Sequence, residues 1–329
     1  MSCRDYPTRP PIPPKPPGPP PVPPPPTTGF VLSVSDYGAV SHQPDSLWQT
    51  DMTFFAASKY AVVRIWVDWP ENRVHDGRVV NADGSLNSGH AERLGRILTG
   101  MSALGLQADL TSAGVHVYNG SLGAMTAGLS AFAQKFSTFT NVFQMDVANE
   151  FEDEGFYGSG RSVVELAGLT RAVKAQAPKW RITASTSGDS TGIANRYRDL
   201  IAAGGNVEVL CPHFQRTDDW GSKVYERTIN VRTILAGAGI VRPIFLQEEN
   251  RDTEPGWSQS QSTLAAQGAK KAGAIGYCFH TDAGFDQRGW LPTIRPEEKS
   301  AFLALPAAVA SVTAASSAAS GLRGRRAGR

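Results

Sequence analysis

Two acidic residues stand directly after short apolar segments that lie far apart in the chain. Glu150 follows the segment 142–148 and is preceded by Asn149, and Glu248 follows the segment 244–247, five residues after Pro243. Two carboxyl groups held about 5 to 5.5 Å apart can cleave a glycosidic bond with retention, one protonating the leaving oxygen and the other attacking the anomeric carbon. Glu150 and Glu248 are therefore candidate catalytic residues.

Glu249 competes with Glu248 for the second of these catalytic positions. Side chains alternate along a strand, so Ile244, Leu246 and Glu248 share one face. If Ile244 and Leu246 point into the centre of the fold, Glu248 does so too and Glu249 points away. The ordinary alternative for both glutamates is a solvated loop charge.

Alternation also places an arginine next to these carboxylates. Arg64, Trp66 and Asp68 share one face of the predicted strand 62–67. A buried arginine requires an anionic partner, and an ionised Glu248 would supply one. The alternative is an ion pair between Arg64 and Asp68 that only braces the rim of the fold.

The elements that would position these residues are short β-branched or aromatic segments alternating with helical patterns, which is typical of βα units and a parallel sheet. The predicted strands are 30–35, 62–67, 106–111, 142–148, 181–185, 207–211, 244–248 and 275–279. Eight units in about 280 residues favour an α/β fold of the (β/α)8 TIM-barrel type, whose active sites lie at the carboxyl ends of the strands. A flavodoxin-like or Rossmann fold would need fewer strands and a phosphate-binding loop.

Helical spacing and capping signals support the same organisation. Apolar residues recur at helical spacing in the sets Leu94, Ile97, Leu98, Met101 and Val231, Ile234, Leu235, Ala238. Capping-box spacing is found for Ser162 with Glu165 and for Ser258 with Gln261. Left-handed helix ends are expected at glycines that stand just before predicted strands, namely Gly105, Gly205, Gly239 and Gly273.

Composition divides the 329 residues into three parts. Of 23 prolines, 14 lie in the segment 7–26, which predicts an extended polyproline spacer, and the sequence beyond Ala307 turns to Ala, Ser, Gly and Arg. We predict a Pro-rich linker at 1–28, a single catalytic domain at 29–306 and a disordered basic tail at 307–329. A Pro-rich stalk on a glycan-degrading enzyme suggests export, but no secretory signal is visible, so the location stays open.

Charge and cysteine content exclude several kinds of partner. The formal net charge of +2 arises from the two tails, which carry +2 and +4, so the middle of the chain carries −4. A basic nucleic-acid-binding face is therefore not expected, and no apolar segment is long enough to predict a membrane span. The odd, widely spaced cysteines Cys3, Cys211 and Cys278 predict neither a disulfide framework nor a zinc site.

With these features, residues 30 to 305 resemble the clan A glycoside hydrolases, a cellulase- and mannanase-like superfamily of retaining (β/α)8 enzymes with Asn-Glu ending strand four and Glu ending strand seven. The resemblance implies that Glu150 is the acid/base, that Asn149 donates to the 2-hydroxyl of the reacting sugar, and that Glu248 is the nucleophile. It also implies substrate-side roles for Arg64 and His213.

The chain departs from the clan at three positions. Many members have a Tyr after the histidine of strand six, where this chain has Phe214 and Gln215. The end of strand eight lacks the common Trp and offers Phe279 or His280 to contact the sugar. The histidine near the end of strand three is also absent, because His116 comes later, and we expect it at the surface.

Tryptophans in loops are candidate platforms for sugar rings, whose apolar C–H faces stack on aromatic side chains. Four of them follow predicted strands two, six, seven and eight, on the expected catalytic side, and we assign them to substrate binding: Trp69, Trp220, Trp257 and Trp290. Three others are expected in the core: Trp48, Trp66 and Trp180.

Other catalytic classes lack their motifs. The first predicted strand has no His-x-His pair for a metal-dependent amidohydrolase, 158–160 lacks the third glycine of a dinucleotide fingerprint, and 186–188 lacks the pattern around a nucleophilic serine. We expect a monomeric, cofactor-free retaining glycoside hydrolase acting on β-linked oligo- or polysaccharides, without nucleic acid or membrane partners. The alternatives are a non-catalytic carbohydrate-binding barrel and a transglycosylase with the same site.

Overall fold

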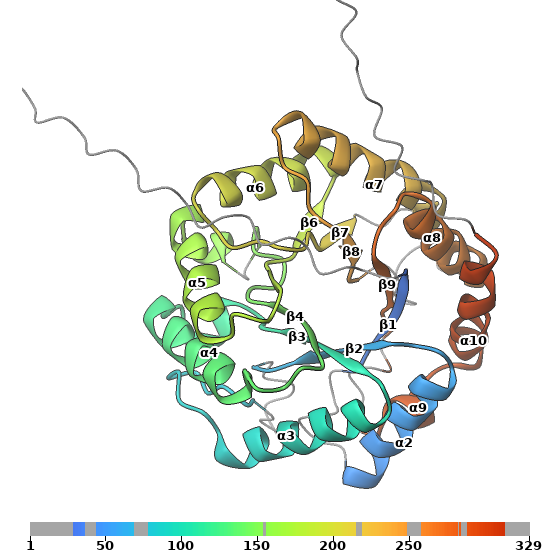
Figure 1. Ribbon diagram of the computed structural model, residues 1–329, viewed down its shortest axis with the longest axis horizontal. Coiled ribbons are helices and arrows are strands. Elements are labelled where there is room, and N and C mark those ends of the chain that lie inside the picture. Colours follow the sequence, from blue (N-terminus) through green and yellow to red (C-terminus); the bar gives the residue numbers. More distant parts are fainter. Residues whose placement is uncertain are drawn as a thin grey trace, which may run out of the picture.

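The computed structural model describes residues 29–36, 44–68, 78–153, 156–214, 219–248, 258–281, 283 and 288–312. Strands occupy the middle of the fold and helices surround them (Figure 1). The strands are β1 (Val31–Ser35), β2 (Val62–Trp66), β3 (Gln107–Thr111), β4 (Val142–Asp146), β5 (Ile182–Thr183), β6 (Thr186–Gly188), β7 (Pro212–Phe214), β8 (Phe245–Leu246) and β9 (Gly276–Phe279). The α-helices are α2 (Asp45–Ala57), α3 (Ser88–Ala103), α4 (Leu122–Phe136), α5 (Val163–Gln176), α6 (Ser190–Ala202), α7 (Trp220–Gly237), α8 (Gln259–Lys271), α9 (Trp290–Thr293) and α10 (Pro296–Ala310), with 3-10 turns η1 (Val115–Tyr118) and η2 (Tyr157–Ser159).

The strands form a curled parallel sheet. Seven of them pair in the order β5-β4-β3-β2-β1-β9-β8, and β6 pairs with β7 in a second sheet. The segment leading into β7 joins the two edges, because the Glu208 amide donates to the Ile182 carbonyl at 2.8 Å and the Phe245 amide donates to the Leu210 carbonyl at 2.9 Å. This arrangement of parallel strands and outer helices is that of a TIM-barrel-type α/β fold, as expected from the alternating pattern.

Seven of the predicted strand segments contain the observed strands β1 to β5, β8 and β9. A further short strand, β6, begins at Thr186, just after the predicted range 181–185, and β7 begins at Pro212, just after the predicted range 207–211. Pro212 starts β7, a position where its missing N–H removes no internal ladder hydrogen bond. The predicted strand 207–211 thus ends one residue before β7 begins. Within the predicted range, Leu210 forms a parallel bridge to Ile244.

Helix-start signals were largely correct. Ser162 and Glu165 form the full reciprocal capping box of α5. Ser258 accepts from the Gln261 amide as the N-cap of α8, but the Gln261 side chain instead accepts from the Gly221 amide at 2.8 Å, so the second box is only half formed.

Helix faces and ends show two small errors in the sequence-based assignment. Leu94, Ile97, Leu98 and Met101 are all buried on α3, as predicted, whereas α7 ends at Gly237 and leaves Ala238 exposed. At the end of α6, Gly204 with φ of 81° takes the left-handed conformation, not the predicted Gly205. A Cβ on Gly205 would instead meet Leu200.

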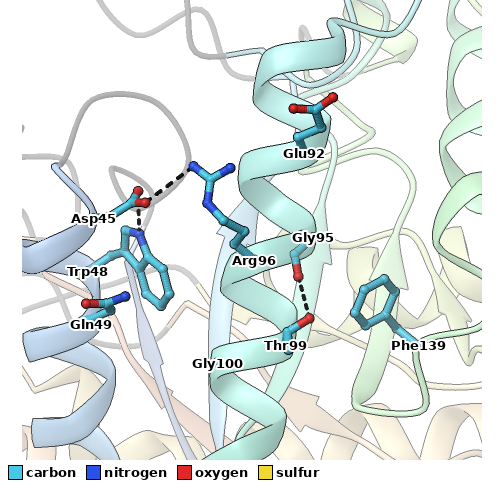
Figure 2. Close-up of a pocket in the computed structure, with 9 residues that line it drawn as sticks. All are labelled: Asp45, Trp48, Gln49, Glu92, Gly95, Arg96, Thr99, Gly100 and Phe139. Carbon is cyan, nitrogen blue, oxygen red and sulfur yellow. Dashed lines mark hydrogen bonds and ion pairs between the residues drawn. The ribbon is translucent and has the colours of Figure 1, made fainter.

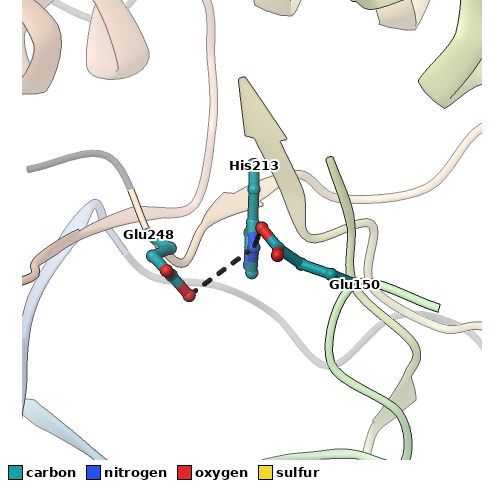
Figure 3. Close-up of side chains that lie close together, drawn as sticks. All are labelled: Glu150, His213 and Glu248. Carbon is teal, nitrogen blue, oxygen red and sulfur yellow. Dashed lines mark hydrogen bonds and ion pairs between the residues drawn. The ribbon is translucent and has the colours of Figure 1, made fainter. Parts of the chain in front are cut away.

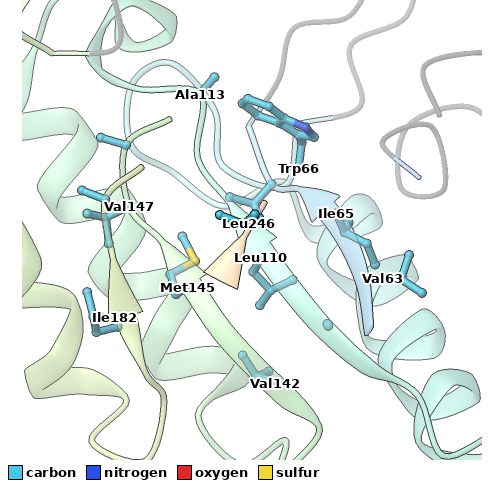
Figure 4. Packing of buried hydrophobic residues seen from close by; sticks show 14 of the residues in the cluster. Val63, Ile65, Trp66, Leu110, Ala113, Val142, Met145, Val147, Ile182 and Leu246 are labelled. Carbon is cyan, nitrogen blue, oxygen red and sulfur yellow. The ribbon is translucent and has the colours of Figure 1, made fainter. Parts of the chain in front are cut away.

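The two faces of the sheet pack differently. The outer face forms a hydrophobic layer with the helices, in which Val63, Ile65, Leu110, Met145 and Leu246 are buried (Figure 4). The inner face carries a separate apolar cluster of Val62, Phe143, Val209, Cys211, Phe245 and Cys278. Nearer the carboxyl ends of the strands, buried polar side chains occupy the interior.

A β-bulge changes the phase of β4. Val142 pairs with Ala108 and Gln144 pairs with Asp109, so Phe143 is an extra residue in the ladder. After the bulge, Met145 packs in the outer layer and Asp146 lies inside, where it approaches Arg64 at 3.8 Å. The bulge thus sets which residues of this strand reach the interior.

The last helix runs further than the predicted domain boundary at 306. Helix α10 continues to Ala310, and Val309 is buried against the fold. Pro306 lies inside this helix. Among the described residues, none of the helices has the length and apolar character needed to cross a membrane.

Candidate functional site

Glu150 and Glu248 meet at the carboxyl ends of β4 and β8. One carboxylate oxygen of each, together with His213 Nδ1 from β7, lie within 4.8 Å of one another (Figure 3). The Glu248 side chain is 12% exposed and that of Glu150 is 34% exposed, so both border a partly open space. Strand ends that are distant in sequence therefore bring the two expected carboxylates together.

Arg64 is the cation of this site and is fully buried. Its Nη1 donates to Glu248 Oε2 at 2.7 Å, its Nη2 to Asn149 Oδ1 at 2.7 Å, and its Nε to Thr111 Oγ1 at 3.1 Å. A buried guanidinium is stable only with such charged and hydrogen-bonding partners. The expected pairing of Arg64 with a strand-end carboxylate is thus present, and it favours the ionised form of Glu248.

Asp68, the alternative partner for Arg64, has a different set of contacts. Its carboxylate accepts from Ser112 Oγ, from the Ala113 amide at 2.7 Å and from Tyr118 Oη at 2.7 Å. Burial raises the pKa of Asp68, and these hydrogen bonds act in the opposite direction. Asp68 therefore braces the loop after β3.

Asn149 has a fixed amide orientation. Its Oδ1 accepts from Arg64 Nη2 and from Ser185 Oγ at 3.2 Å. Since the carbonyl oxygen is used in this way, Nδ2 is the group that this side chain can offer to a ligand, and it can only donate. This orientation suits a substrate hydroxyl that accepts a hydrogen bond.

Glu150 has an unusual backbone conformation for a residue other than glycine. Its φ is 44°, in the left-handed region. Neighbouring hydrogen bonds hold it there: the Glu150 amide donates to Ser185 Oγ at 3.1 Å, the Asn149 amide to the Ser112 carbonyl and the Phe151 amide to the Ser185 carbonyl. Strained backbone supported by its surroundings occurs preferentially at functional sites.

His213 lies between the two glutamates and is 2% exposed. Its Nδ1 is 3.0 Å from Glu150 Oε1 and 3.6 Å from Glu248 Oε2, and its Nε2 is 3.3 Å from Gln247 Oε1. Burial lowers the pKa of His213, but the Glu248 charge and the hydrogen bond to Glu150 outweigh burial and raise it above its ordinary value. A protonated imidazole is therefore favoured between the two carboxylates.

His280 approaches Glu248 from the other side. Its Nε2 is 3.5 Å from Glu248 Oε1, and its Nδ1 is 3.0 Å from Ser35 Oγ on β1. The ring is 1% exposed. His280 thus sits at the end of β9 against the candidate nucleophile, while Phe279 packs in the hydrophobic layer.

Two further carboxylates lie deeper in the interior. Burial raises the pKa of Asp109 to about 7, against the opposing effect of the Arg64 charge. Burial also raises the pKa of Asp146, again opposed by Arg64. Arg64 is therefore the shared counter-charge of Glu248, Asp109 and Asp146.

Glu150, His213 and Glu248 together offer one nitrogen and two oxygen ligands, a donor set that a divalent transition metal accepts. The same Glu248 oxygen, however, already accepts from the Arg64 guanidinium at 2.7 Å. The raised pKa of His213 also favours a proton over a metal on Nδ1. Arg64 and His213 therefore supply the positive charge here.

The premise of the alternation argument for Glu248 was wrong, although Glu248 does lie at the site. Ile244 and Leu246 pack in the outer layer, whereas Phe245 lies in the inner apolar cluster and Gln247 binds interior side chains. Glu248 still reaches the site because β8 ends at Leu246 and regular alternation ends with it. Glu249 lies outside the described residues, so the choice between the two glutamates stays a prediction.

Two of the four tryptophans assigned to substrate binding are core residues. Trp290 is 0% exposed and its ring lies 5.0 Å from that of Phe55 and 4.8 Å from that of Phe302, centroid to centroid. Trp220 is 1% exposed within the main hydrophobic cluster. The assignment of both to sugar stacking was wrong, because helices α2, α7 and α10 bury the loop-proximal aromatics that spacing alone placed near the mouth.

Some of the remaining predictions for aromatic residues and His116 fall on described residues, and others do not. Trp69 and Trp257 lie outside the described residues and stay predictions, as does the environment of Gln215. Trp48, Trp66 and Trp180 are buried and His116 is exposed, as expected.

Several site residues were not identified from the sequence. Four of them contact expected residues through buried side chains, namely Gln247, Thr111, Ser185 and Ser35, and the fifth, Asp109, accepts from Gln247. Their common signal is a polar residue inside an otherwise apolar strand segment. Such a residue must face a polar interior, because a buried polar group without a partner is costly.

A surface hollow of about 650 Å³ lies elsewhere, between α2 and α3 (Figure 2). Asp45 there accepts from Trp48 Nε1 at 3.1 Å and pairs with Arg96 at 3.4 Å. The hollow is on the outer, helical side of the fold, whereas the carboxylates lie at the strand ends. Its charged groups brace two helices and form no paired-carboxylate arrangement.

No protein-family model matches the chain, and no curated protein matches it significantly in sequence. Solved structures do match. The exo-beta-1,4-mannosidase Op5Man5 from Opitutaceae bacterium strain TAV5 has a TM-score of 0.61 at 13% identity, over 85% of this chain and 60% of that chain. PbGH5A, a glycoside hydrolase family 5 enzyme from Prevotella bryantii B14, has a TM-score of 0.59 at 14% identity, over 85% and 96%. The beta-mannanase from blue mussel Mytilus edulis has a TM-score of 0.57 at 13% identity, over 84% and 92%.

These matches define the fold. The chain shares its TIM-barrel-type fold with these three enzymes, as the expected arrangement of strands implied. It spans about 60% of the length of the mannosidase, and the sequence identities are low enough that the similarity concerns architecture. Neither activity nor substrate follows from these matches.

Proposed function

We propose that this protein is a retaining glycoside hydrolase that cleaves β-linked oligo- or polysaccharides by double displacement. The observation that carries the proposal is the approach of one oxygen each of Glu150 and Glu248 within 4.8 Å, with Arg64 bonded to Glu248. This spacing is close to the roughly 5 to 5.5 Å between carboxyl groups in retaining enzymes and below the roughly 6.5 to 9.5 Å of inverting enzymes. We assign the catalytic unit to residues 29–306 together with the rest of α10.

In the first step, Glu248 attacks the anomeric carbon while Glu150 gives its proton to the glycosidic oxygen, and the bond to the leaving sugar breaks. In the second step, Glu150 as carboxylate takes a proton from water, which attacks the same carbon and frees Glu248. Arg64 keeps Glu248 ionised before attack, and Asn149 Nδ2 donates to the 2-hydroxyl. His280, whose Nε2 lies 3.5 Å from Glu248 Oε1, supplies the polar side chain beside the nucleophile that Phe214 cannot provide.

The substrate class is drawn from the structural neighbours. They include mannosidases and mannanases, and PbGH5A in a complex with a xyloglucan tetradecasaccharide. We therefore choose β-mannan and xyloglucan as the first polymers to test. No step of the proposed reaction uses a cofactor.

The decisive experiment is trapping with 2-deoxy-2-fluoro glycosides of several sugars, followed by peptide mapping. A covalent label on Glu248 is expected in the wild type and in Glu208→Gln, a variant that loses the 2.7 Å ion pair with Lys174 and keeps an acceptor oxygen for the Ile182 amide. Glu248→Gln should take up no label. A label on Glu249 would reassign the nucleophile, and inverted product stereochemistry would overturn the proposed mechanism.

Glu150→Gln separates catalysis from binding alone. An enzyme should lose at least about a hundredfold in rate with poor leaving groups, since general acid catalysis contributes roughly 10² to 10⁴. A non-catalytic carbohydrate-binding protein would retain its ligand and show no turnover before or after the change. Products elongated by added acceptor sugars would identify a transglycosylase.

A further inference from the structure

A chain of hydrogen bonds links a buried carboxylate to the candidate acid/base. Asp109 Oδ2 accepts from Gln247 Nε2 at 2.9 Å, Gln247 Oε1 faces His213 Nε2 at 3.3 Å, and His213 Nδ1 faces Glu150 Oε1 at 3.0 Å. Asp109 and Gln247 are fully buried and His213 is 2% exposed. Neither Asp109 nor Gln247 has a role in the reaction described above.

At its buried end, this series of hydrogen bonds allows only one orientation of the Gln247 amide. A carboxylate oxygen can only accept, so the Gln247 amide must turn its NH₂ toward Asp109 and its oxygen toward His213. Thr111 Oγ1 is a further acceptor near the same NH₂, at 3.5 Å. Asp109 Oδ1 has no hydrogen-bond partner among the described side chains, so protonation of that oxygen would leave Oδ2 as the acceptor for Gln247.

An amide oxygen opposite His213 Nε2 requires a hydrogen on that nitrogen. Nδ1 is then the only ring nitrogen that can gain or lose a proton, and it faces Glu150. We propose that Gln247, oriented by Asp109, fixes the tautomer of His213 so that His213 and Glu150 share one proton across the Nδ1–Oε1 contact. The catalytic meaning of this inference rests on the proposed function, whereas the tautomer of His213 depends only on its contact with Gln247, which Asp109 orients.

The proton exchange is balanced at each stage. When Glu150 is the carboxylic acid, Nδ1 carries a lone pair and accepts from the Glu150 hydroxyl. When the proton moves to Nδ1, Glu150 becomes a carboxylate beside an imidazolium. Before bond cleavage the proton returns to Glu150 Oε1 and passes to the glycosidic oxygen, and in the second step Glu150 takes one back from water.

The surrounding charges support both states. Glu248 lies 3.6 Å from His213 Nδ1 and favours the imidazolium, together with the nearby Asp146 carboxylate. Arg64 opposes it, and burial also lowers the pKa of His213, yet the balance raises that pKa. Gln247 is thus a positioning residue that acts through His213.

The tautomer can be measured directly. With ¹⁵N-labelled histidine, long-range ¹H–¹⁵N spectra of the wild type, assigned with a His213→Gln variant, should show neutral His213 with its hydrogen on Nε2. Gln247→Leu should lose this single form, and Gln267→Leu should keep it. Gln267 is a control because its amide donates to the Ala308 carbonyl at 3.1 Å, away from Asp109 and His213. A wild-type hydrogen on Nδ1 in the neutral ring would overturn the proposal.

Kinetics supply the second readout. Gln247→Leu should lose roughly tenfold to a hundredfold in kcat/KM with a poor leaving group, the effect of one hydrogen bond to a charged group, and much less with a dinitrophenyl glycoside that needs no acid. Its basic pH limb should move to lower pH, because the imidazolium has lost an acceptor. Equal losses for both leaving groups with an unmoved pH profile would overturn the inference.

The two proposals fail in different ways. If the wild type hydrolyses no glycoside, the proposed function fails, and the ¹⁵N spectra still decide whether Gln247 fixes the tautomer. If the wild type is active but neutral His213 is protonated on Nδ1, only the proton-sharing inference fails. If Gln247→Leu does not fold, the wild-type spectrum remains the deciding measurement. Asp109→Asn, which retains an acceptor oxygen for Gln247, should keep the wild-type tautomer.

Discussion

The two faces of the parallel sheet use alternate residues of the same strands for different purposes. On β2, Val63 and Ile65 are buried in the layer between strands and helices, while Arg64 between them lies inside with Glu248 and Asn149. On β8, Leu246 packs outside and Gln247, next to it, binds Asp109. The outer face gains stability from apolar burial, whereas the inner face holds charge.

The inner face carries the free-energy cost of burying charged groups. Removing charged groups from water is unfavourable by several kcal/mol per ion unless they are paired. The interior places Arg64 among Glu248, Asp109 and Asp146, and two of these carboxyls have raised pKa values. The apolar outer layer offsets this cost, so activity and stability should respond separately to changes on the two faces.

The largest effect is expected on the inner face. Glu248→Gln removes the proposed nucleophile and should lower kcat by roughly 10⁴-fold or more, in the range seen for loss of other catalytic nucleophiles. Steady-state kinetics on β-mannan and aryl β-glycosides would measure it. Glu208→Gln, at the opposite ends of the strands, should remain close to wild type. A comparable loss of kcat in Glu248→Gln and Glu208→Gln would show that the carboxyl ends of the strands are not the catalytic side.

The outer layer is tested by Trp290→Ala. Deleting this ring from its contacts with Phe55 and Phe302 should reduce the free energy of unfolding by about 3 to 5 kcal/mol. At a temperature where the variant stays folded, KM should not change. Urea unfolding and KM for a polymeric substrate are the measurements. A raised KM with unchanged stability would restore Trp290 as a sugar platform.

Arg64→Met tests whether a charged residue of the inner face also contributes to stability. Loss of the guanidinium removes the buried cation that Glu248 and Asp146 share, so the free energy of unfolding should fall by about 3 to 5 kcal/mol at pH 8. The loss should be smaller at pH 4, where the carboxylates can take protons. Unfolding curves at both pH values test this. An equal loss at pH 4 would mean that Arg64 acts mainly by packing.

The smallest effect concerns Asp109 and pH. Because burial raises its pKa to about 7 from an ordinary 3.8, the folded chain keeps a proton between these pH values that the unfolded chain releases. The contribution of Asp109 to stability therefore falls as pH rises through this window, by up to about 1.4 kcal/mol per pH unit, and is level above it. Asp109→Asn should remove that slope.

Urea unfolding of both proteins at pH 5 and pH 7 gives the comparison. The difference in unfolding free energy between the two pH values should shrink by roughly 1 to 3 kcal/mol in Asp109→Asn. Parallel pH dependences would show that Asp109 is already ionised in the folded chain at pH 5. The exposed Asp83, whose pKa is lowered by Ser85, offers a surface control with Asp83→Asn.

Much of the fold was predictable because its signals are local. The periodicity of α3 and the capping box of Ser162 and Glu165 depend on residues within one or two turns. The strand boundaries near Pro212 and the end of α10 were less predictable, since they depend on which neighbours supply hydrogen bonds and apolar contacts. Burial of Trp220 and Trp290 depends on helices that are distant in sequence.

The sequence by itself determined that Asn149, Glu150 and Glu248 end apolar strand segments. Their meeting could be expected from this, because parallel strands with helical crossovers bring all their carboxyl ends to one rim. Only the tertiary structure decided that Gln247 faces inward, that His280 reaches Glu248, and that His213 stands between the glutamates. Those facts arise from the bulge in β4, the end of β8 and the curvature of the sheet, which place side chains by relations across strands and not by order along the chain.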